Sequence, residues 1–116
     1  MKKITVKKPW GLFIQFTHNQ KSTVKILEVN PDEILSLQSH KKRGEFWYVL
    51  EGTPTIVINN SIKKYKKSEF IRIRRGIKHR IINKTKKIVR VLEISIGSFD
   101  ENDIVRYEDK YNRLKK

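Results

Sequence analysis

The chain has 116 residues, which is enough for one hydrophobic core but not for two. It contains no cysteine, which excludes disulfides and thiolate chemistry and agrees with a cytoplasmic location. Lys and Arg (27) outnumber Asp and Glu (12), so the net charge is +15, and no apolar run is long enough to span a membrane or to form a signal peptide.

Short stretches rich in Ile, Val, Phe and Tyr, separated by Gly, Pro, Asn or Lys pairs, predict a chain built from β-strands. Asn59-Asn60 predicts a two-residue hairpin turn, because Asn tolerates a positive φ. Asp100 is expected to cap a helical turn that starts at Glu101–Asp103. About nine short strands without a long helix favour a sandwich or a barrel. The expected strands are 11–17, 23–29, 34–38, 45–51, 53–58, 61–64, 69–72, 78–83 and 86–96.

Side chains that bind metal ions gather where one expected strand ends and the next begins. Gln38 and His40 are two residues apart and share a face of their strand, while Glu45 returns on the following strand after a Lys-Lys-Arg-Gly turn. A second histidine, His79, lies far along the chain. Together they form a mixed oxygen and nitrogen set, which suits one divalent ion such as Zn²⁺, Mn²⁺, Fe²⁺, Co²⁺ or Ni²⁺. We therefore predict that Gln38, His40, Glu45 and His79 bind a metal ion.

Two motifs match those of the cupin proteins, with Gln in place of the usual first His: Gln38-x-His40-x4-Glu45-x6-Gly52 and Gly76-x2-His79-x3-Asn83. A longer run resembles the signature of the type II phosphomannose isomerase cupin domain: Leu35-Ser36-Leu37-Gln38-x-His40-x2-Arg43-x-Glu45-x-Trp47. That domain is usually fused behind a mannose-1-phosphate guanylyltransferase, a part with no counterpart here. Lys8-Pro9-Trp10-Gly11 and segment 97–113 extend the resemblance to residues 8–113.

The resemblance implies an all-β fold, the cupin double-stranded β-helix or jelly-roll barrel, with the short helical turn near the C-terminus. A single domain over residues 1–116 is expected. Its core would occupy about 23–97, with an N-terminal flanking strand at 8–20 and a tail at 98–116.

The resemblance also implies an enzyme, a mannose-6-phosphate isomerase that interconverts mannose 6-phosphate and fructose 6-phosphate through a cis-enediol. This proton shift needs a base, an electrophile and a phosphate anchor, and the metal ion is the natural electrophile. Arg43 is the candidate for stabilising the enediolate and Glu93 for the base. Lys42 and Arg106 are the candidates for binding substrate.

Several positions depart from the family pattern. The family has three consecutive histidines where this chain has His40 followed by two lysines, and a further histidine where it has Phe46. Ser68 and Arg74 stand where Gly and Pro are usual. Two alternatives therefore stay open: a non-catalytic, metal-containing cupin that binds a sugar or metabolite, and a different cupin enzyme such as an oxygenase or epimerase.

The excess of basic residues does not favour a nucleic-acid partner, because the lysines are dispersed in pairs rather than gathered in one block. A positive field would instead draw in a small anionic sugar phosphate. Arg72, Arg74, Arg75 and Arg80 fit either an anion patch or a solvated strand face. The outward apolar side chains of Phe46, Tyr48 and Leu50, together with the family's flanking strands, predict a homodimer.

Overall fold

A computed structural model describes residues 3–97, 100 and 102–111. Within these residues the protein is all β, with eleven strands and no helix. The strands are β1 (Ile4–Lys8), β2 (Gly11–Gln15), β3 (Ser22–Val29), β4 (Leu37–Ser39), β5 (Gly44–Glu51), β6 (Thr55–Ile58), β7 (Ser61–Lys64), β8 (Phe70–Ile73), β9 (His79–Ile82), β10 (Val89–Ile96) and β11 (Val105–Glu108).

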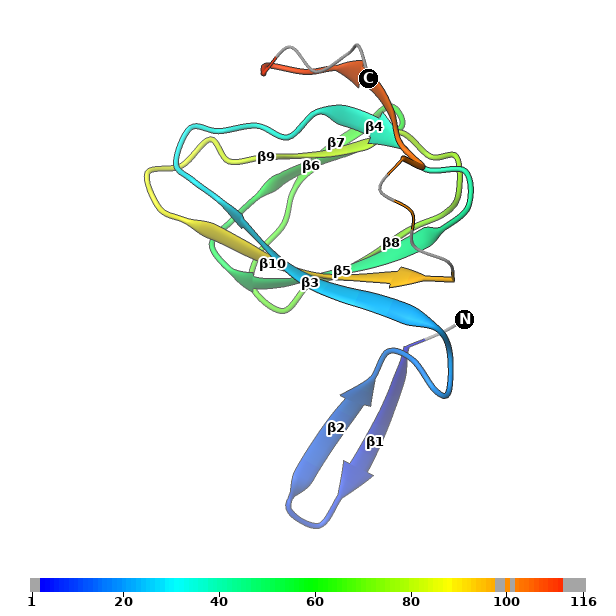
Figure 1. The fold of residues 1–116 in the computed structure, drawn as a ribbon. Helices are drawn as coiled ribbons and strands as arrows, with labels where there is room; N and C mark the ends of the chain where they lie inside the picture. Colours follow the sequence, from blue (N-terminus) through cyan, green and yellow to red (C-terminus); the bar gives the residue numbers. More distant parts are fainter. Residues whose placement is uncertain (1–2, 98–99, 101, 112–116) are drawn as a thin grey trace.

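Two sheets face each other and enclose the core (Figure 1). One has the strand order β3-β10-β5-β8 and the other β11-β4-β9-β6-β7, with every pairing antiparallel. Neighbours in the sheets are mostly distant in sequence, as in a jelly roll. The expected all-β barrel is confirmed.

Alternation along β5 and β10 divides the barrel interior into an apolar end and a polar end. Val49 pairs with Val91 in the register between these strands, and both are fully buried. Further along the same inward faces, Trp47 pairs with Glu93, and Glu45 pairs with Ser95. Each buried aliphatic side chain contributes about 1.5–3 kcal/mol to stability, so the apolar end anchors the fold. The polar end is then held rigidly on the same two strands.

Two turns agree with their local sequence. Asn59 has a φ of +52° and closes the hairpin between β6 and β7, as its Asn-Asn dipeptide predicts. Gly52 has a φ of +84°, and a Cβ at this position would lie 2.9 Å from the carbonyl oxygen of Ile88. The glycine of the first motif is therefore required by backbone geometry.

Ser68 stands where Gly is usual, and its φ of +73° lies in the left-handed region that favours glycine. A side chain in the left-handed region is sterically strained. We expect Ser68→Gly to raise the free energy of unfolding by about 0.5–1 kcal/mol. Thermal or urea unfolding would measure the gain, with Ser61→Gly in strand β7 as the control expected to lower stability. An unchanged or lower midpoint for Ser68→Gly would contradict the prediction.

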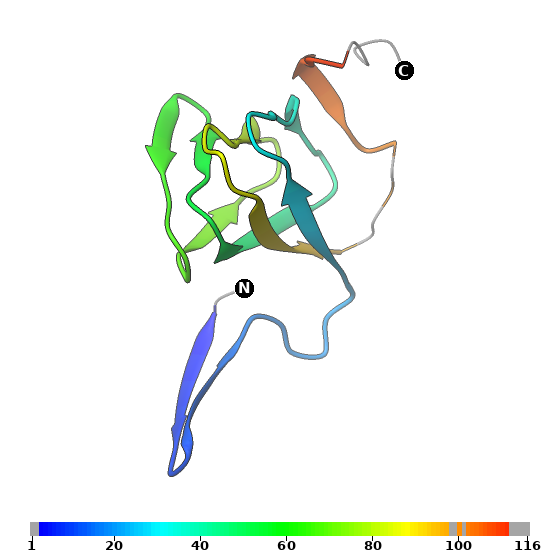
Figure 2. The same ribbon diagram turned by 90° about the vertical axis from the view of Figure 1, so that its left-hand side faces the viewer.

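The N-terminal region differs from the single flanking strand expected at 8–20. It forms a hairpin of β1 and β2, with Lys8 opposite Gly11, which stands away from the barrel (Figure 2). Strand β1 was not predicted, because its short alternation of Ile, Val and Lys is a weak signal before a Pro. Beyond the hairpin, the ring of Phe16 returns to the outer face of the barrel, 5.6 Å from Tyr48 and 5.4 Å from Phe70.

The helical turn expected at Glu101–Asp103 begins at Glu101, which lies outside the described residues, and no helix is assigned at Asn102 or Asp103. Asp100 does accept a backbone hydrogen bond from Asn102 through its side chain, but the chain then runs extended into β11. Strand β11 pairs with β4, placing Arg106 opposite Gln38. Strand pairing therefore satisfies backbone groups that a helix would have satisfied internally.

The outer apolar side chains cited for a homodimer are partly covered by the chain itself. Phe46 is only 4% exposed and stacks on Phe70 at 5.2 Å. Val24 and Ile26 on β3 are each 59% exposed. The homodimer stays a prediction.

None of the described segments forms a helix with the length and apolar character needed to cross a membrane.

Candidate metal centre

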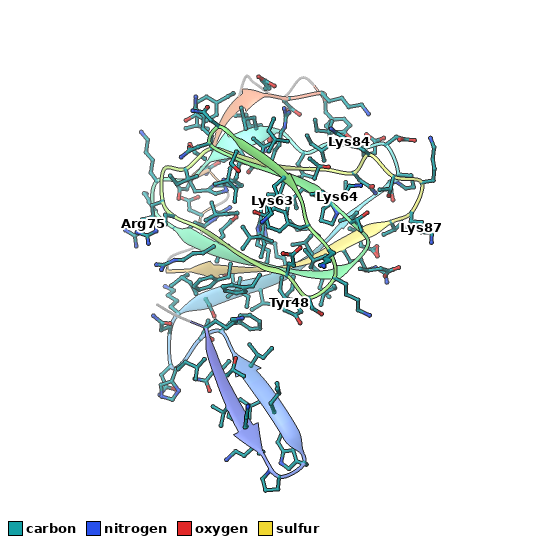
Figure 3. The ribbon with its side chains drawn as sticks, turned by 180° about the vertical axis from the view of Figure 1, so that it is seen from behind. Tyr48, Lys63, Lys64, Arg75, Lys84 and Lys87 are labelled. Carbon is teal, nitrogen blue, oxygen red and sulfur yellow. The ribbon has the colours of Figure 1, made fainter. Side chains whose placement is uncertain are left out.

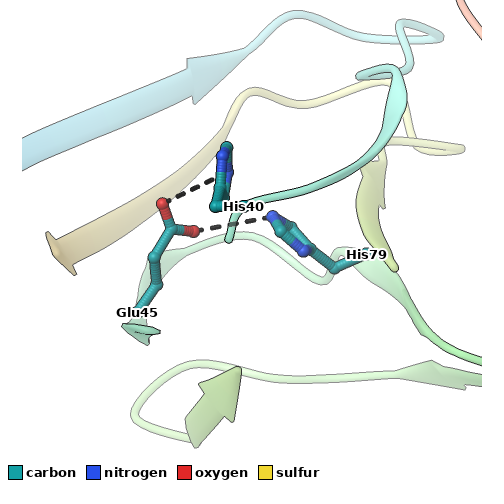
Figure 4. A group of neighbouring side chains, drawn as sticks. All are labelled: His40, Glu45 and His79. Carbon is teal, nitrogen blue, oxygen red and sulfur yellow. Dashed lines mark ion pairs between the residues drawn. The ribbon is translucent and has the colours of Figure 1, made fainter. Parts of the chain in front are cut away.

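Three predicted ligands converge inside the polar end of the barrel (Figure 4). His40 follows β4, Glu45 lies on β5, and His79 begins β9. Glu45 Oε2 is 3.6 Å from His40 Nε2, and Glu45 Oε1 is 3.6 Å from His79 Nε2. All three side chains are buried. The structure thus brings together residues up to 39 positions apart in sequence, as the motif spacing predicted.

Backbone carbonyls determine which ring nitrogen of each histidine faces the centre. His40 Nδ1–H donates to the carbonyl oxygen of Asp103 at 2.6 Å, and His79 Nδ1–H donates to that of Ile77 at 2.9 Å. Nε2 of each neutral ring therefore carries a lone pair directed toward Glu45. This is the arrangement by which proteins orient histidine ligands to a metal ion.

The protonation states also suit metal binding. Burial lowers the pKa of His79 to about 4 and lowers the pKa of His40, so both rings are neutral near pH 7. Burial raises the pKa of Glu45, while the adjacent Arg43 guanidinium opposes that shift. The Arg43 guanidinium lies against Glu45 Oε2 and His40 Nε2, whereas the lone pair of His79 Nε2 and Glu45 Oε1, 3.6 Å apart, repel one another unless a cation lies beside them.

One buried atom supports this interpretation directly. Among the described residues, Glu45 Oε1 has no hydrogen-bond partner. The other oxygen, Oε2, accepts a hydrogen bond from Arg43 Nε at 3.1 Å. Because an unpaired buried carboxylate oxygen is costly, His40, Glu45 and His79 fit a divalent cation.

The remaining predicted residues lie at different places around this centre. A cavity of about 160 Å³ adjoins it, lined by Gln38, Arg43, Glu93 and Arg106 among others. Gln38 Nε2 donates to Ser36 Oγ at 3.1 Å, and a fourth-ligand role for Gln38 stays a prediction. Lys42 is exposed and does not line the cavity.

Glu93 has the environment of a proton-transfer group. Its carboxylate is buried, and Trp47 Nε1–H donates to its Oε2 at 3.2 Å. Burial, followed by the negative charge of Glu45, raises the pKa of Glu93 to about 7. A carboxylate with this pKa can both take and return a proton at neutral pH.

Arg43 is a buried cation held at three points. Besides Glu45, its guanidinium contacts the lone pair of His40 Nε2 at 3.3 Å and the carbonyl oxygen of Asp100 at 3.3 Å. Its position beside the cavity places a fixed positive charge close to the three ligands.

Two residues of this centre were missed from the sequence. Lys25 lines the cavity and lies opposite Glu93 in the sheet register. Lys25 lies four residues before buried Val29 on β3, so the two side chains share the inward face of the strand. This spacing could have identified Lys25 as an interior residue. Asp103 binds the β4–β5 loop through hydrogen bonds from the backbone of Lys41 and Lys42, both 2.9 Å, in addition to orienting His40. No local pattern signals that role.

Comparison with known sequences shows the family. Residues 1–109 match the family described as Mannose-6-phosphate isomerase C-terminal. The mannose-1-phosphate guanylyltransferase ManC of Salmonella typhimurium is 36% identical over 110 residues, which are 94% of this chain and 23% of that protein. The chain therefore spans about a quarter of the length of such curated relatives.

Comparison with solved structures shows the fold. A sugar phosphate isomerase of the cupin superfamily from Silicibacter pomeroyi has a TM-score of 0.62 and 20% identity, covering 69% of this chain and 52% of that one. A double-stranded β-helix protein from Klebsiella pneumoniae has a TM-score of 0.66 and 16% identity, covering 81% and 80%. The barrel is a cupin double-stranded β-helix.

Proposed function

The chain belongs to the mannose-6-phosphate isomerase C-terminal family, and from this premise we propose that it is a metal-dependent isomerase of mannose 6-phosphate and fructose 6-phosphate. The observation that carries the proposal is the convergence of His40, Glu45 and His79 beside the buried carboxylate of Glu93. Aldose–ketose isomerisation needs these two elements together, a cation at the substrate oxygens and a base at the adjacent carbons.

His40, Glu45 and His79 would hold the ion, with Gln38 as the proposed fourth ligand. A divalent ion bound there supplies positive charge to the carbonyl and hydroxyl oxygens of the open-chain sugar. Reloading the stripped protein with Zn, Mn, Fe, Co or Ni identifies which ion it uses.

Glu93 is the proposed base. Its carboxylate takes the proton from C2 of open-chain mannose 6-phosphate while O1 gains a proton, which gives the cis-enediol. Glu93 then returns the proton to C1 while the hydroxyl at C2 loses its own, which gives fructose 6-phosphate. The raised pKa of Glu93 supports this exchange near pH 7.

Arg43 is proposed to stabilise negative charge on the enediolate oxygens. Its burial and its three contacts keep the guanidinium in one place, so no reorganisation is needed when charge develops. Arg43 also keeps Glu45 in position through the Nε–Oε2 hydrogen bond.

The phosphate of the substrate is proposed to bind Lys25 and Arg106, which line the cavity. Arg106 Nε is buried and has no hydrogen-bond partner among the described residues, which favours an anionic ligand. We expect Lys25→Gln and Arg106→Gln each to raise KM about tenfold or more with a smaller change in kcat. Lys42→Gln removes the same charge outside the cavity and serves as the matched control. An equal rise in KM for Lys42→Gln would contradict this assignment.

A coupled assay of fructose 6-phosphate formation tests the function. The purified chain would be stripped with a chelator, reloaded with each of the five divalent ions, and supplied with mannose 6-phosphate. We expect turnover with at least one ion and none in the stripped protein. If every loaded form is inactive yet mannose 6-phosphate still raises the thermal midpoint, the non-catalytic binding alternative replaces the enzyme.

A further inference from the structure

A second cavity lies at the edge of the barrel beside the start of β5, and Glu45 of the metal centre contributes to its lining. Its volume is about 420 Å³, and its lining includes Gln20, Phe46, Arg72, Arg74 and Arg75. It lies where β5 begins and where β8 and β10 end, since Gly44 pairs with Ile96 and Glu45 with Ile73. Glu45 points into the barrel and Phe46 points out, because side chains alternate along a strand. Phe46 and its register partner Arg72 therefore face outward in this cavity, whereas the Glu45 side chain faces the metal centre.

The three arginines at this cavity differ from the other arginines of the surface. Arg80 pairs with Glu108, and Arg90 pairs with both Glu28 and Glu51. Among the described residues, no carboxylate pairs with Arg72, Arg74 or Arg75. Three neighbouring guanidinium groups without a counter-charge repel one another, and an anion between them removes that repulsion.

The site is also partly preorganised. The guanidinium of Arg72 lies 5.7 Å from the centroid of the Phe46 ring, which is itself buried and stacked on Phe70. Stacking on a fixed ring restricts the guanidinium and leaves its N–H groups available for hydrogen bonds. Arg74 and Arg75 follow directly on the end of β8, and the backbone of Gly76 anchors their turn by donating to the carbonyl oxygen of His40 at 2.8 Å.

We infer that Arg72, Arg74 and Arg75 form a second anion site, which binds small phosphate monoesters through the phosphate group. Planar guanidinium groups match the oxygens of a phosphate in bidentate hydrogen bonds, which lysines do not reproduce. Phe46 offers no exposed ring face for a nucleobase, since its side chain is buried and packs against Arg72 and Phe70. The ligand is therefore recognised by its phosphate and not by a base.

Titration of the zinc-loaded protein with glycerol 3-phosphate tests this inference, with glycerol as the uncharged control. Isothermal calorimetry gives the dissociation constant, and amide chemical shifts locate the ligand. Binding should perturb the amides of Phe46 and of residues 72–76, and Arg72→Gln/Arg74→Gln/Arg75→Gln should weaken it about tenfold or more. The double variant Arg74→Gln/Arg75→Gln keeps the Arg72–Phe46 stack and should also weaken binding. It keeps the test valid if the triple variant fails to fold.

The control variant removes three charges elsewhere: Lys64→Gln/Lys84→Gln/Lys87→Gln. Figure 3 shows these lysines on the opposite side of the barrel from Arg75, and all three are exposed. The control should bind glycerol 3-phosphate within about twofold of wild type. An equal loss in the control would mean that net charge alone attracts the ligand, and it overturns the site. Chemical-shift changes confined to Gln38 and Arg106, or the absence of binding, would also overturn the site. So would tighter binding of a single-stranded oligonucleotide at Lys64, Lys84 and Lys87.

Discussion

Replacing His79 with alanine should abolish stoichiometric metal binding and, with it, isomerase activity. Wild type is expected to hold about one divalent ion per chain, and His79→Ala should weaken binding by about 10²-fold or more, because one of three converging ligands is lost. His40→Ala should behave alike, since its Nε2 faces the same carboxylate. Elemental analysis after dialysis against trace metal, with mass measurement under native conditions, gives the occupancy.

His18 provides the matched control for this experiment. It is exposed, and its ring is hydrogen-bonded to the side chain of the neighbouring Asn19. His18→Ala should keep the metal content of wild type. Circular dichroism must show that the three variants retain the β fold, because a buried imidazole also contributes packing. Equal metal in wild type, His40→Ala and His79→Ala would mean that the three residues are not the ligands.

Replacing Glu93 with glutamine should lower kcat by about 10²- to 10⁴-fold while leaving the metal bound. The amide has nearly the same shape as the carboxylic acid but cannot take a proton, so a loss confined to kcat identifies the base. The substitution should not destabilise the barrel, because it removes a buried carboxylate whose pKa is already raised to about 7. Steady-state kinetics on the metal-loaded enzyme, together with its metal content, makes the measurement.

Glu51→Gln is the control for Glu93→Gln. Glu51 lies on β5, is exposed, and pairs with Arg90 on the surface. It should retain kcat within about twofold, as expected for an exposed ion pair. A Glu93→Gln enzyme with kcat within about threefold of wild type would exclude Glu93 as the base. A Glu93→Gln protein that loses its metal would instead make Glu93 part of the metal site.

The division of the interior into an apolar and a polar end explains how so small a barrel supports such a site. Val49, Val89 and Val91 are fully buried at one end, whereas Glu45, Glu93 and Ser95 occupy the same inward faces at the other. Buried charges are costly, and here the cost is confined to one end of strands that are held at the opposite end by aliphatic packing. This arrangement keeps the site rigid without a larger core.

The sequence by itself was sufficient for the all-β class, the turn at Asn59-Asn60 and the grouping of His40, Glu45 and His79. These depend on short-range regularities: alternation places residues two apart on one face, and a turn dipeptide joins adjacent strands. Motif spacing then identified His79 as the distant partner. The resemblance carried by those motifs agrees with the family match over residues 1–109.

Only the tertiary structure decided which strands became neighbours and which side chains lie opposite one another inside the barrel. The pairing of β11 with β4 brings Asp103 to His40 across 63 positions. Long-range pairing likewise placed Lys25 opposite Glu93 and left Lys42 outside the cavity. Local alternation determines the face of a side chain, but the partner across the barrel depends on sheet order, which is set by burial summed over the whole chain.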